Sequence, residues 1–220
     1  MFLEVKNVTK SIHGDVVIKN VSLCSERGRV IGLRGINGSG KTMLMRLISG
    51  LIRPTKGQVL IDGKVVSKDI PFPRSLGVLI EGPAFLDDYS AMDNLKLIAY
   101  PKGKVTEDEI KAVLSEVRLD PKSRKKYKKF SLGMKQRLGI AAAVMEHPDL
   151  ILLDEPTNAL DESGVDMLGD IVKKEKERGA VLIVSSHDRD ILEDISDEIY
   201  DLEQGEIVRH SIKGEKRNEG

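Results

Sequence analysis

A glycine-rich turn with the sequence GINGSGKT occupies residues 35–42, between an apolar segment at residues 30–34 and a segment with helical spacing at residues 41–51. A strand that enters a helix through such a turn fits few folds, because the glycines leave N–H groups exposed at a helix N-terminus. These groups attract phosphate oxygens. The turn fits the pattern G-x-x-x-x-G-K-[ST], so the residues predicted to surround the phosphates of a nucleotide are Gly35, Asn37, Gly38, Ser39 and Gly40.

The two side chains that end the turn carry the chemistry of this pattern. Lys41 is expected to neutralise the β- and γ-phosphates, and the Thr42 hydroxyl is expected to be a ligand of Mg²⁺. A nucleotide with Mg²⁺ is therefore the predicted ligand. The alternative is a glycine turn that is followed by a lysine by chance.

A second signal lies at residues 150–155, where four apolar residues precede two acids. A buried parallel strand delivers the groups at its carboxyl end to the edge where α/β proteins bind ligands. We expect Asp154 to hold Mg²⁺, directly or through water, and Glu155 to orient and deprotonate the attacking water. An acidic strand end is common by itself, but it becomes a strong signal when the same chain carries the glycine-rich turn.

The composition excludes several classes of protein. The chain has 220 residues, one cysteine and 35 residues of each charge, which suits one domain with at most a small inserted lobe. A single cysteine excludes a framework of internal disulfides, and Cys24 is expected to be a small buried group. Apolar runs are shorter than the ~18 residues of a membrane span, and the first residues contain no signal-peptide core. The neutral total argues against nucleic acid as a partner, and we expect a cytoplasmic domain.

The order of apolar and helical segments predicts a covered parallel sheet. Strands are expected at residues 30–34, 76–80, 150–154, 181–185 and 198–202, with helices between the later ones. Other strands at residues 2–8, 16–23 and 58–61 predict an antiparallel β-subdomain near the N-terminus. Helices at residues 90–100, 106–117 and 131–145 predict an inserted helical subdomain.

The predicted fold is therefore α/β, a P-loop NTPase with a parallel-sheet core, an antiparallel β-subdomain and a helical subdomain. Residues 1–81 and 138–220 would form the core with its β-subdomain, and residues 82–137 the helical subdomain, within one domain of residues 1–220.

Three further segments carry a resemblance to ATP-binding-cassette (ABC) ATPases. The sequence FSLGMKQR at residues 130–137 resembles the signature segment of that family. The sequence DEPTNALD at residues 154–161 is similar to its Walker B run and D-loop, and SSHD at residues 185–188 to its switch-histidine segment. Because the match covers nearly all of the chain in the family's order, the chain is identified as a member of this family.

The resemblance implies a head-to-tail homodimer that holds two ATP molecules, each between the P-loop of one subunit and the signature of the other. Ser131 and the backbone of Gly133 would then contact the γ-phosphate that the partner's P-loop binds. His187 would contact the same phosphate and help to hold the lytic water. Asp161 would cross the interface and couple the two sites.

Four positions depart from the family pattern. Leu132 and Met134 replace a glycine and the glutamine of the signature, which resembles the branch that serves bacitracin- and lantibiotic-type exporters. Glu81 stands at the place of the Q-loop glutamine, where a carboxylate can still ligate Mg²⁺ and accept a hydrogen bond from water, so we assign it to the catalytic and the metal residues. The alternative is that Glu81 is a surface acid in a loop. Ile12 stands where an aromatic side chain normally stacks on adenine, and it is expected to contact the base without the π interaction, with His13 as the alternative at this position.

With no predicted membrane span, the energy of hydrolysis would be used by a separate partner. The leading interpretation is a Mg²⁺-dependent ATPase, the nucleotide-binding subunit of an ABC transporter that powers a transmembrane permease, with export favoured over import. The chain would then lie on the inner face of the cell membrane, bound through the permease. The alternative is a soluble ABC-type ATPase in regulation or assembly. Four side chains after the Q-loop position either dock the permease or fill the core of the helical subdomain: Phe85, Leu86, Tyr89 and Met92.

Overall fold

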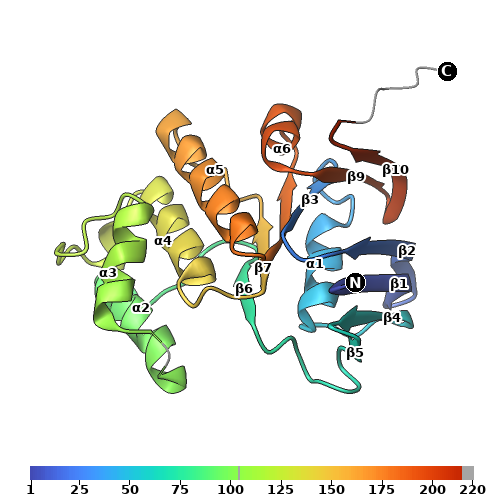
Figure 1. The fold of residues 1–220 in the computed structure, drawn as a ribbon, viewed down its shortest axis with the longest axis horizontal. Coiled ribbons are helices and arrows are strands. Elements are labelled where there is room, and N and C mark those ends of the chain that lie inside the picture. The colour runs from blue at the N-terminus through green and yellow to red at the C-terminus, as the bar shows by residue number, and fades with distance from the viewer. Residues whose placement is uncertain (104, 215–220) are drawn as a thin grey trace.

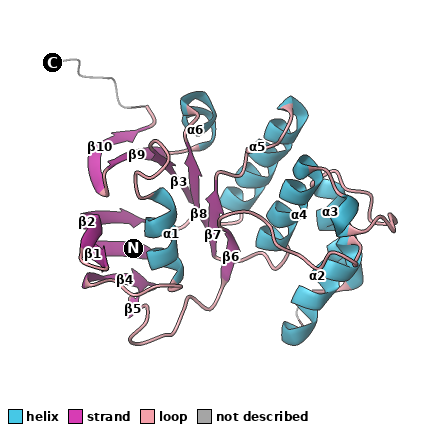
Figure 2. Cartoon of the chain, turned by 180° about the vertical axis from the view of Figure 1, so that it is seen from behind, coloured by secondary structure: helices cyan, strands magenta, loops and turns pink. Residues whose placement is uncertain are grey.

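The computed structural model describes residues 1–103 and 105–214, so the last part of the predicted core segment, residues 215–220, lies outside the described residues. The large sheet has the strand order β10-β9-β3-β8-β7-β6, and a small antiparallel sheet has the order β2-β1-β4-β5 (Figure 1). The small sheet and helices α2 and α3 lie at opposite ends of the molecule, with the large sheet between them (Figure 2). This arrangement confirms the predicted α/β fold class.

The large sheet is parallel except for its last strand. Its strands are β3 (Arg29–Arg34), β6 (Leu76–Leu79), β7 (Leu150–Asp154), β8 (Val181–Ser186), β9 (Glu198–Glu203) and β10 (Glu206–Ile212). Among the strand pairs that the described residues form in this large sheet, only the pair of β10 with β9 is antiparallel. The carboxyl ends of β3, β6, β7 and β8 therefore meet at one edge of the sheet.

The remaining elements cover this sheet. The small sheet consists of β1 (Leu3–Ile12), β2 (Asp15–Ser25), β4 (Lys56–Ile61) and β5 (Lys64–Val65). The helices are α1 (Lys41–Ser49), α2 (Ala91–Ala99), α3 (Glu107–Glu116), α4 (Leu132–Val144), α5 (Glu162–Glu177) and α6 (Arg189–Ile195). Two 3₁₀ turns, η1 (Tyr100–Lys102) and η2 (Tyr127–Lys129), complete the described elements.

Both faces of strand β7 are buried, and its residues alternate between two hydrophobic clusters. Leu150 and Leu152 belong to the cluster that includes α1 and the small sheet. Ile151 and Leu153 belong to the cluster that includes helices α2 to α5. Successive side chains of a strand point to opposite faces, so an unbroken apolar run requires a cover on each side.

Helix α4 joins the helical part of the chain to the sheet. It packs against β6 and β7 on one side and against α2 and α3 on the other. The predicted boundary at residues 137 and 138 falls inside this helix. The division into a core and a helical subdomain stays a prediction, and α4 belongs to both parts.

The prediction that Cys24 is buried is wrong. Strand β2 buries Leu23 and Ser25, and Cys24 lies on the opposite, exposed face of the strand.

Within residues 1–103 and 105–214, no helix is both long and apolar enough to cross a membrane.

Gly77 on β6 and Gly169 on α5 offer a matched pair of glycine substitutions. A Cβ on Gly77 would collide with the carbonyl oxygen of Ala143 on α4, whereas a Cβ on Gly169 would meet no atom within 4 Å. We expect Gly77→Ala to lower the free energy of unfolding by about 1–3 kcal/mol, since it overpacks this contact. Gly169→Ala should raise it by about 0.5–1 kcal/mol, because alanine favours the helix. Urea unfolding of both variants measures the difference, and equal effects would contradict the packing of β6 on α4.

Candidate nucleotide-binding and catalytic site

The glycine-rich turn has a backbone conformation that side chains would oppose. Gly38 and Gly40 have φ angles of 83° and 112°, in the left-handed region, and Gly40 is the residue before α1. A Cβ on Gly35 would meet the carbonyl oxygen of Leu202 and lie 2.5 Å from Ser39 Oγ. Glycine at these three positions therefore permits the turn that opens α1.

The turn between β9 and β10 supports the glycine-rich turn from behind. The N–H of Gly205 donates to the carbonyl oxygen of Ser39 at 2.9 Å, and its own carbonyl accepts from the N–H of Lys19 at 2.8 Å. A side chain on Gly205 would collide with the carbonyl oxygen of Val17. The phosphate-binding turn is thus held by backbone contacts from the distant β9–β10 turn.

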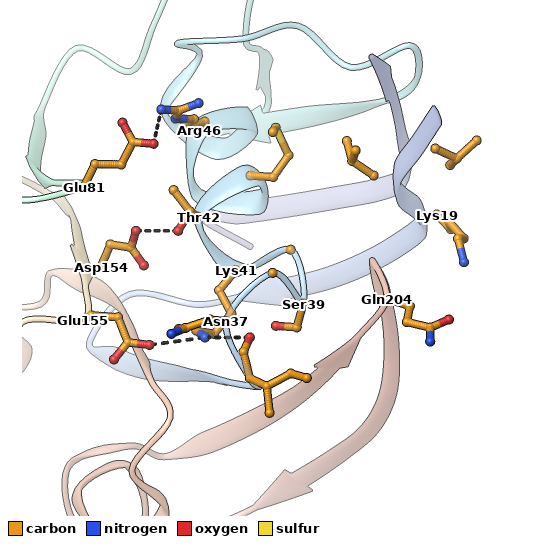
Figure 3. Close-up of a pocket in the computed structure, with 16 residues that line it drawn as sticks. Lys19, Asn37, Ser39, Lys41, Thr42, Arg46, Glu81, Asp154, Glu155 and Gln204 are labelled. Carbon is orange, nitrogen blue, oxygen red and sulfur yellow. Dashed lines mark hydrogen bonds and ion pairs between the residues drawn. The ribbon is translucent and has the colours of Figure 1, made fainter. Parts of the chain in front are cut away.

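A cleft of about 570 Å³ opens over the N-terminus of α1. Carboxylates lie at one end and Lys19 and Gln204 at the other, with the glycine-rich turn between them (Figure 3). Its lining includes nine of the predicted site residues: Asn37, Gly38, Ser39, Gly40, Lys41, Thr42, Glu81, Asp154 and Glu155.

Lys41 is 5% exposed and lies between the turn and a carboxylate. Its Nζ donates to the carbonyl oxygens of Gly35 and Ile36 at 2.5 and 3.3 Å. It also lies 3.2 Å from Glu155 Oε1, an ion pair without hydrogen-bond geometry. A buried ammonium with these partners is placed to interact with an anion that enters the turn.

Asp154 connects α1 to strand β8 through two hydroxyl groups. Thr42 Oγ1 donates to Asp154 Oδ2 at 2.6 Å, and Ser185 Oγ donates to Asp154 Oδ1 at 2.6 Å. Ser185 Oγ in turn accepts from the N–H of Glu155 at 2.9 Å. Ser185 therefore orients both acids that end β7.

Glu155 and His187 are in direct contact. Glu155 has a φ of 47°, so its backbone is in the left-handed region directly after β7. Its Oε2 lies 2.9 Å from His187 Nδ1. The acid and the histidine were both predicted to act on the same water, and this distance lets one proton or water be shared between them.

The residues fit ATP and Mg²⁺. Ser39 Oγ is buried and has no hydrogen-bond partner among the described residues, as expected of a group that awaits a phosphate oxygen. The adjoining oxygens of Thr42 and Asp154 are the donor type that Mg²⁺ prefers. In the described part of the chain, no three His, Cys, Asp or Glu side chains are grouped to hold a metal, so the ion would need nucleotide phosphates as further ligands.

Six of the predicted residues do not line the cleft: Ile12, Gly35, Ser131, Gly133, Asp161 and His187. The aliphatic lining at the end away from the carboxylates comes instead from Val16 and Val17. Ile12 ends β1 at the opposite side of the turn into β2. Its assignment to the base stays a prediction, for which the cleft gives no support.

Ser131, Gly133 and Asp161 lie together at the start of α4 and α5. Ser131 Oγ caps α4 by accepting from the N–H of Met134 at 3.2 Å. A Cβ on Gly133 would lie 2.8 Å from the carbonyl oxygen of Ala159.

Asp161 caps α5, and Arg137 Nη2 donates to its Oδ1 at 2.8 Å. A hydrogen bond from Ser163 lowers the pKa of the Asp161 carboxyl, and Arg137 acts in the same direction. The carboxylate is thus kept charged at the surface where the two helices start.

Several residues of the site were not predicted. Gln136 Nε2 donates to the carbonyl oxygens of Glu155 and Pro156 at 3.3 and 3.0 Å. Arg46 pairs with Glu81, and Ser185 orients Asp154. Gln136 lies inside the signature-like segment, and Ser185 lies beside the switch histidine, so both had a signal in the sequence. Arg46 had none, because the partner that gives it a role is distant in the chain.

A glycine cradle that faces two carboxylates at the edge of a parallel sheet defines the class of P-loop nucleotide-binding proteins. The chain belongs to the ABC transporter family, whose profile matches residues 18–158. It is an ABC transporter ATP-binding subunit, and ATP hydrolysis is the general activity of its family. The family and the α/β P-loop fold that the sequence predicted are thereby confirmed.

Relatives and a solved structure agree with this membership. The chain is 45% identical over 205 residues to the uncharacterized ABC transporter ATP-binding protein YybJ of Bacillus subtilis (strain 168). The matched region covers 93% of this chain and 94% of YybJ. It is 36% identical to the lantibiotic transport ATP-binding protein SrtF of Streptococcus pyogenes, over 94% of this chain and 89% of SrtF. It is also 36% identical to the bacitracin transport ATP-binding protein BcrA of Enterococcus faecalis, over 94% of this chain and 68% of BcrA. These two relatives confirm the predicted resemblance to the bacitracin and lantibiotic branch.

The fold also matches the dimeric post-hydrolysis structure of the ATP-binding cassette MJ0796 bound to ADP and Pi. The TM-score is 0.86 at 25% identity, over 97% of this chain and all (100%) of that chain. Nucleotide binding is therefore a property of this fold.

Ser185 and Ser186 allow a test of how the acids are held. Ser185→Ala removes the hydroxyl that contacts Asp154 and Glu155, so the rate of ATP hydrolysis should fall about tenfold. Ser186→Ala removes only the hydrogen bond to the N–H of Asp188 and should leave the rate within about twofold of the original. Single-turnover hydrolysis measures both, and similar rates in the two variants would contradict the positioning by Ser185.

Proposed function

We propose that this chain is the Mg²⁺-dependent ATPase that powers a separate transmembrane permease, in an exporter. The proposal of ATP hydrolysis rests on one observation, the cleft in which Lys41 and Thr42 on α1 face Asp154 and Glu155 at the end of β7. The names of SrtF and BcrA, which are transport ATP-binding proteins, support the role in transport. Export is favoured because residues 130–137 resemble the signature segment of the exporter branch.

In the hydrolysis of ATP to ADP and phosphate, Lys41, Glu155 and His187 would each have a separate role. Lys41 would leave Glu155 and stabilise the charge of the transferred phosphoryl group. Glu155, freed from the lysine, would accept a proton as the oxygen of water bonds to the γ-phosphorus and the bond to the ADP oxygen breaks. His187 would hold the water and phosphate from the other side of Glu155.

Mg²⁺ fits beside Thr42 and Asp154, with Glu81 as a third candidate at the same end of the cleft. When bound there, the ion would neutralise charge on the phosphate oxygens. Thr42 and Asp154 would orient it through oxygens that are already held by α1 and β8.

A head-to-tail homodimer would complete the site. Ser131 and Gly133 lie outside the cleft of their own subunit, at the exposed start of α4. In the dimer they would reach the phosphate in the partner's cleft, with Asp161 beside them at the interface. The dimeric form of the MJ0796 cassette supports this arrangement.

Glu155→Gln tests both the catalytic and the dimer proposals. The amide cannot accept the proton of water, so turnover should fall at least about a hundredfold. ATP binding should persist, and the ATP-bound dimer should accumulate because it is not hydrolysed. Steady-state kinetics and sedimentation velocity with ATP measure the two effects. Glu162→Gln changes a neighbouring exposed acid as the control, and retained turnover in Glu155→Gln would refute the role of Glu155.

The segment after Glu81 offers a surface for the permease. Phe85 and Met92 pack against the core cluster, and the Phe85 ring lies 5.4 Å from that of Tyr127. Leu86 and Tyr89, by contrast, are 52% and 43% exposed. We assign docking to Leu86 and Tyr89 and core packing to Phe85 and Met92. Through this contact the chain would lie on the inner face of the cell membrane.

Leu86→Glu should weaken docking without affecting the fold, since its side chain is largely exposed. In the complex, the permease would bury the Leu86 side chain, and loss of this contact should weaken the association about tenfold or more. The measurement is binding and ATPase stimulation with the membrane protein encoded beside this chain, after coexpression. Val208→Glu, at an exposed site on β10, is the control. A soluble ATPase that works without a permease would show neither binding nor stimulation in any variant.

A further inference from the structure

Three contacts connect α1 to the carboxyl ends of β6 and β7. Lys41 pairs with Glu155, Thr42 donates to Asp154, and Arg46 pairs with Glu81 (Figure 3). Each of the three carboxylates that line the cleft therefore has one partner on the same helix. The first two pairs belong to the nucleotide site already described, and the third has no role in it so far.

Glu81 lies just beyond the carboxyl end of β6 and pairs with Arg46 on α1. Its φ of 63° is in the left-handed region, like the φ of 47° of Glu155 beyond β7. Arg46 is four residues after Thr42, so the two side chains share one face of α1. The Arg46 and Glu81 side chains are 31% and 59% exposed, and both line the cleft.

The charge of this end of the cleft depends on the pair. The residues here are three carboxylates and two cations, Lys41 and Arg46. Loss of Arg46 would leave Glu81 as an added negative charge near the position of the γ-phosphate. That charge would repel metal-free ATP more strongly than it repels the complex of ATP with Mg²⁺, because the metal ion neutralises part of the phosphate charge.

We infer that Arg46 is a positioning residue that neutralises Glu81 and so sets how strongly nucleotide binding depends on the metal ion. This inference rests on the proposed function, since it needs ATP and Mg²⁺ in the cleft. An ion pair with this exposure adds little to folding stability, so its effect is on the charge of the site.

The test measures the dissociation constant of ATP by calorimetry, once with Mg²⁺ and once with a chelator. The readout is the metal dependence, defined as the constant without metal divided by the constant with Mg²⁺. Arg46→Met should raise the metal dependence about fivefold, and Glu81→Gln should lower it by a similar factor. The double variant restores the net charge of the original chain, so the double variant and Arg46→Lys should both keep a metal dependence near that of the original chain.

Arg53→Met is the matched control, because it removes the same charge just after α1 from a residue that does not line the cleft. An unchanged metal dependence in Arg46→Met would overturn the inference. So would a double variant that keeps the raised metal dependence of Arg46→Met, because the effect of Arg46 would then not depend on the charge of Glu81. Arg46→Gln gives a second neutral variant should Arg46→Met fold poorly. If the original chain bound no ATP, the proposed function itself would fail, and the inference with it.

Discussion

The burial of both faces of β7 and β8 is the constraint on which the site depends. Each of these strands is buried throughout and begins with four apolar residues, so helices and the small sheet must cover both sides of the large sheet. With α1 on one side and α4 and α5 on the other, the parallel strands end at one edge. Thr42 and Asp154, 112 positions apart in the chain, meet there at 2.6 Å. The catalytic geometry is thus a product of the apolar runs as much as of the polar motifs.

Helix α4 is connected to the catalytic strand by polar contacts as well as by packing. Gln136 donates to the carbonyl oxygens that follow Asp154, and Arg137 pairs with Asp161 at the start of α5. Gly133 allows α4 to approach the carbonyl of Ala159 closely. A displacement of α4 therefore acts directly on the backbone that carries Glu155. These contacts connect the signature-like segment to the backbone of Glu155, the proposed catalytic acid, within one subunit.

The sequence predicted those parts of the site that depend on local pattern. The P-loop, the acids after β7 and the order of strands and helices all follow from spacing and periodicity, and the structure places them together. The contacts of Arg46 with Glu81 and of Ser185 with Asp154 could not be predicted, because each joins segments distant in the chain. Ile12 illustrates the same limit, since an alignment by family position does not show which side of the β1–β2 turn faces the cleft. Cys24 was misjudged because its burial depends on the register of β2, which composition does not determine.

The support of the P-loop by the β9–β10 turn has a consequence for how the protein is made. The N–H of Gly205 donates to the carbonyl oxygen of Ser39, and Gly205 leaves the ribosome after β9 has been synthesised. A nascent chain that already contains the P-loop, both acids and the histidine still lacks the backbone that braces the phosphate cradle. The hydrogen bond that braces the phosphate cradle therefore forms late in synthesis, after five of the six strands of the large sheet have been made.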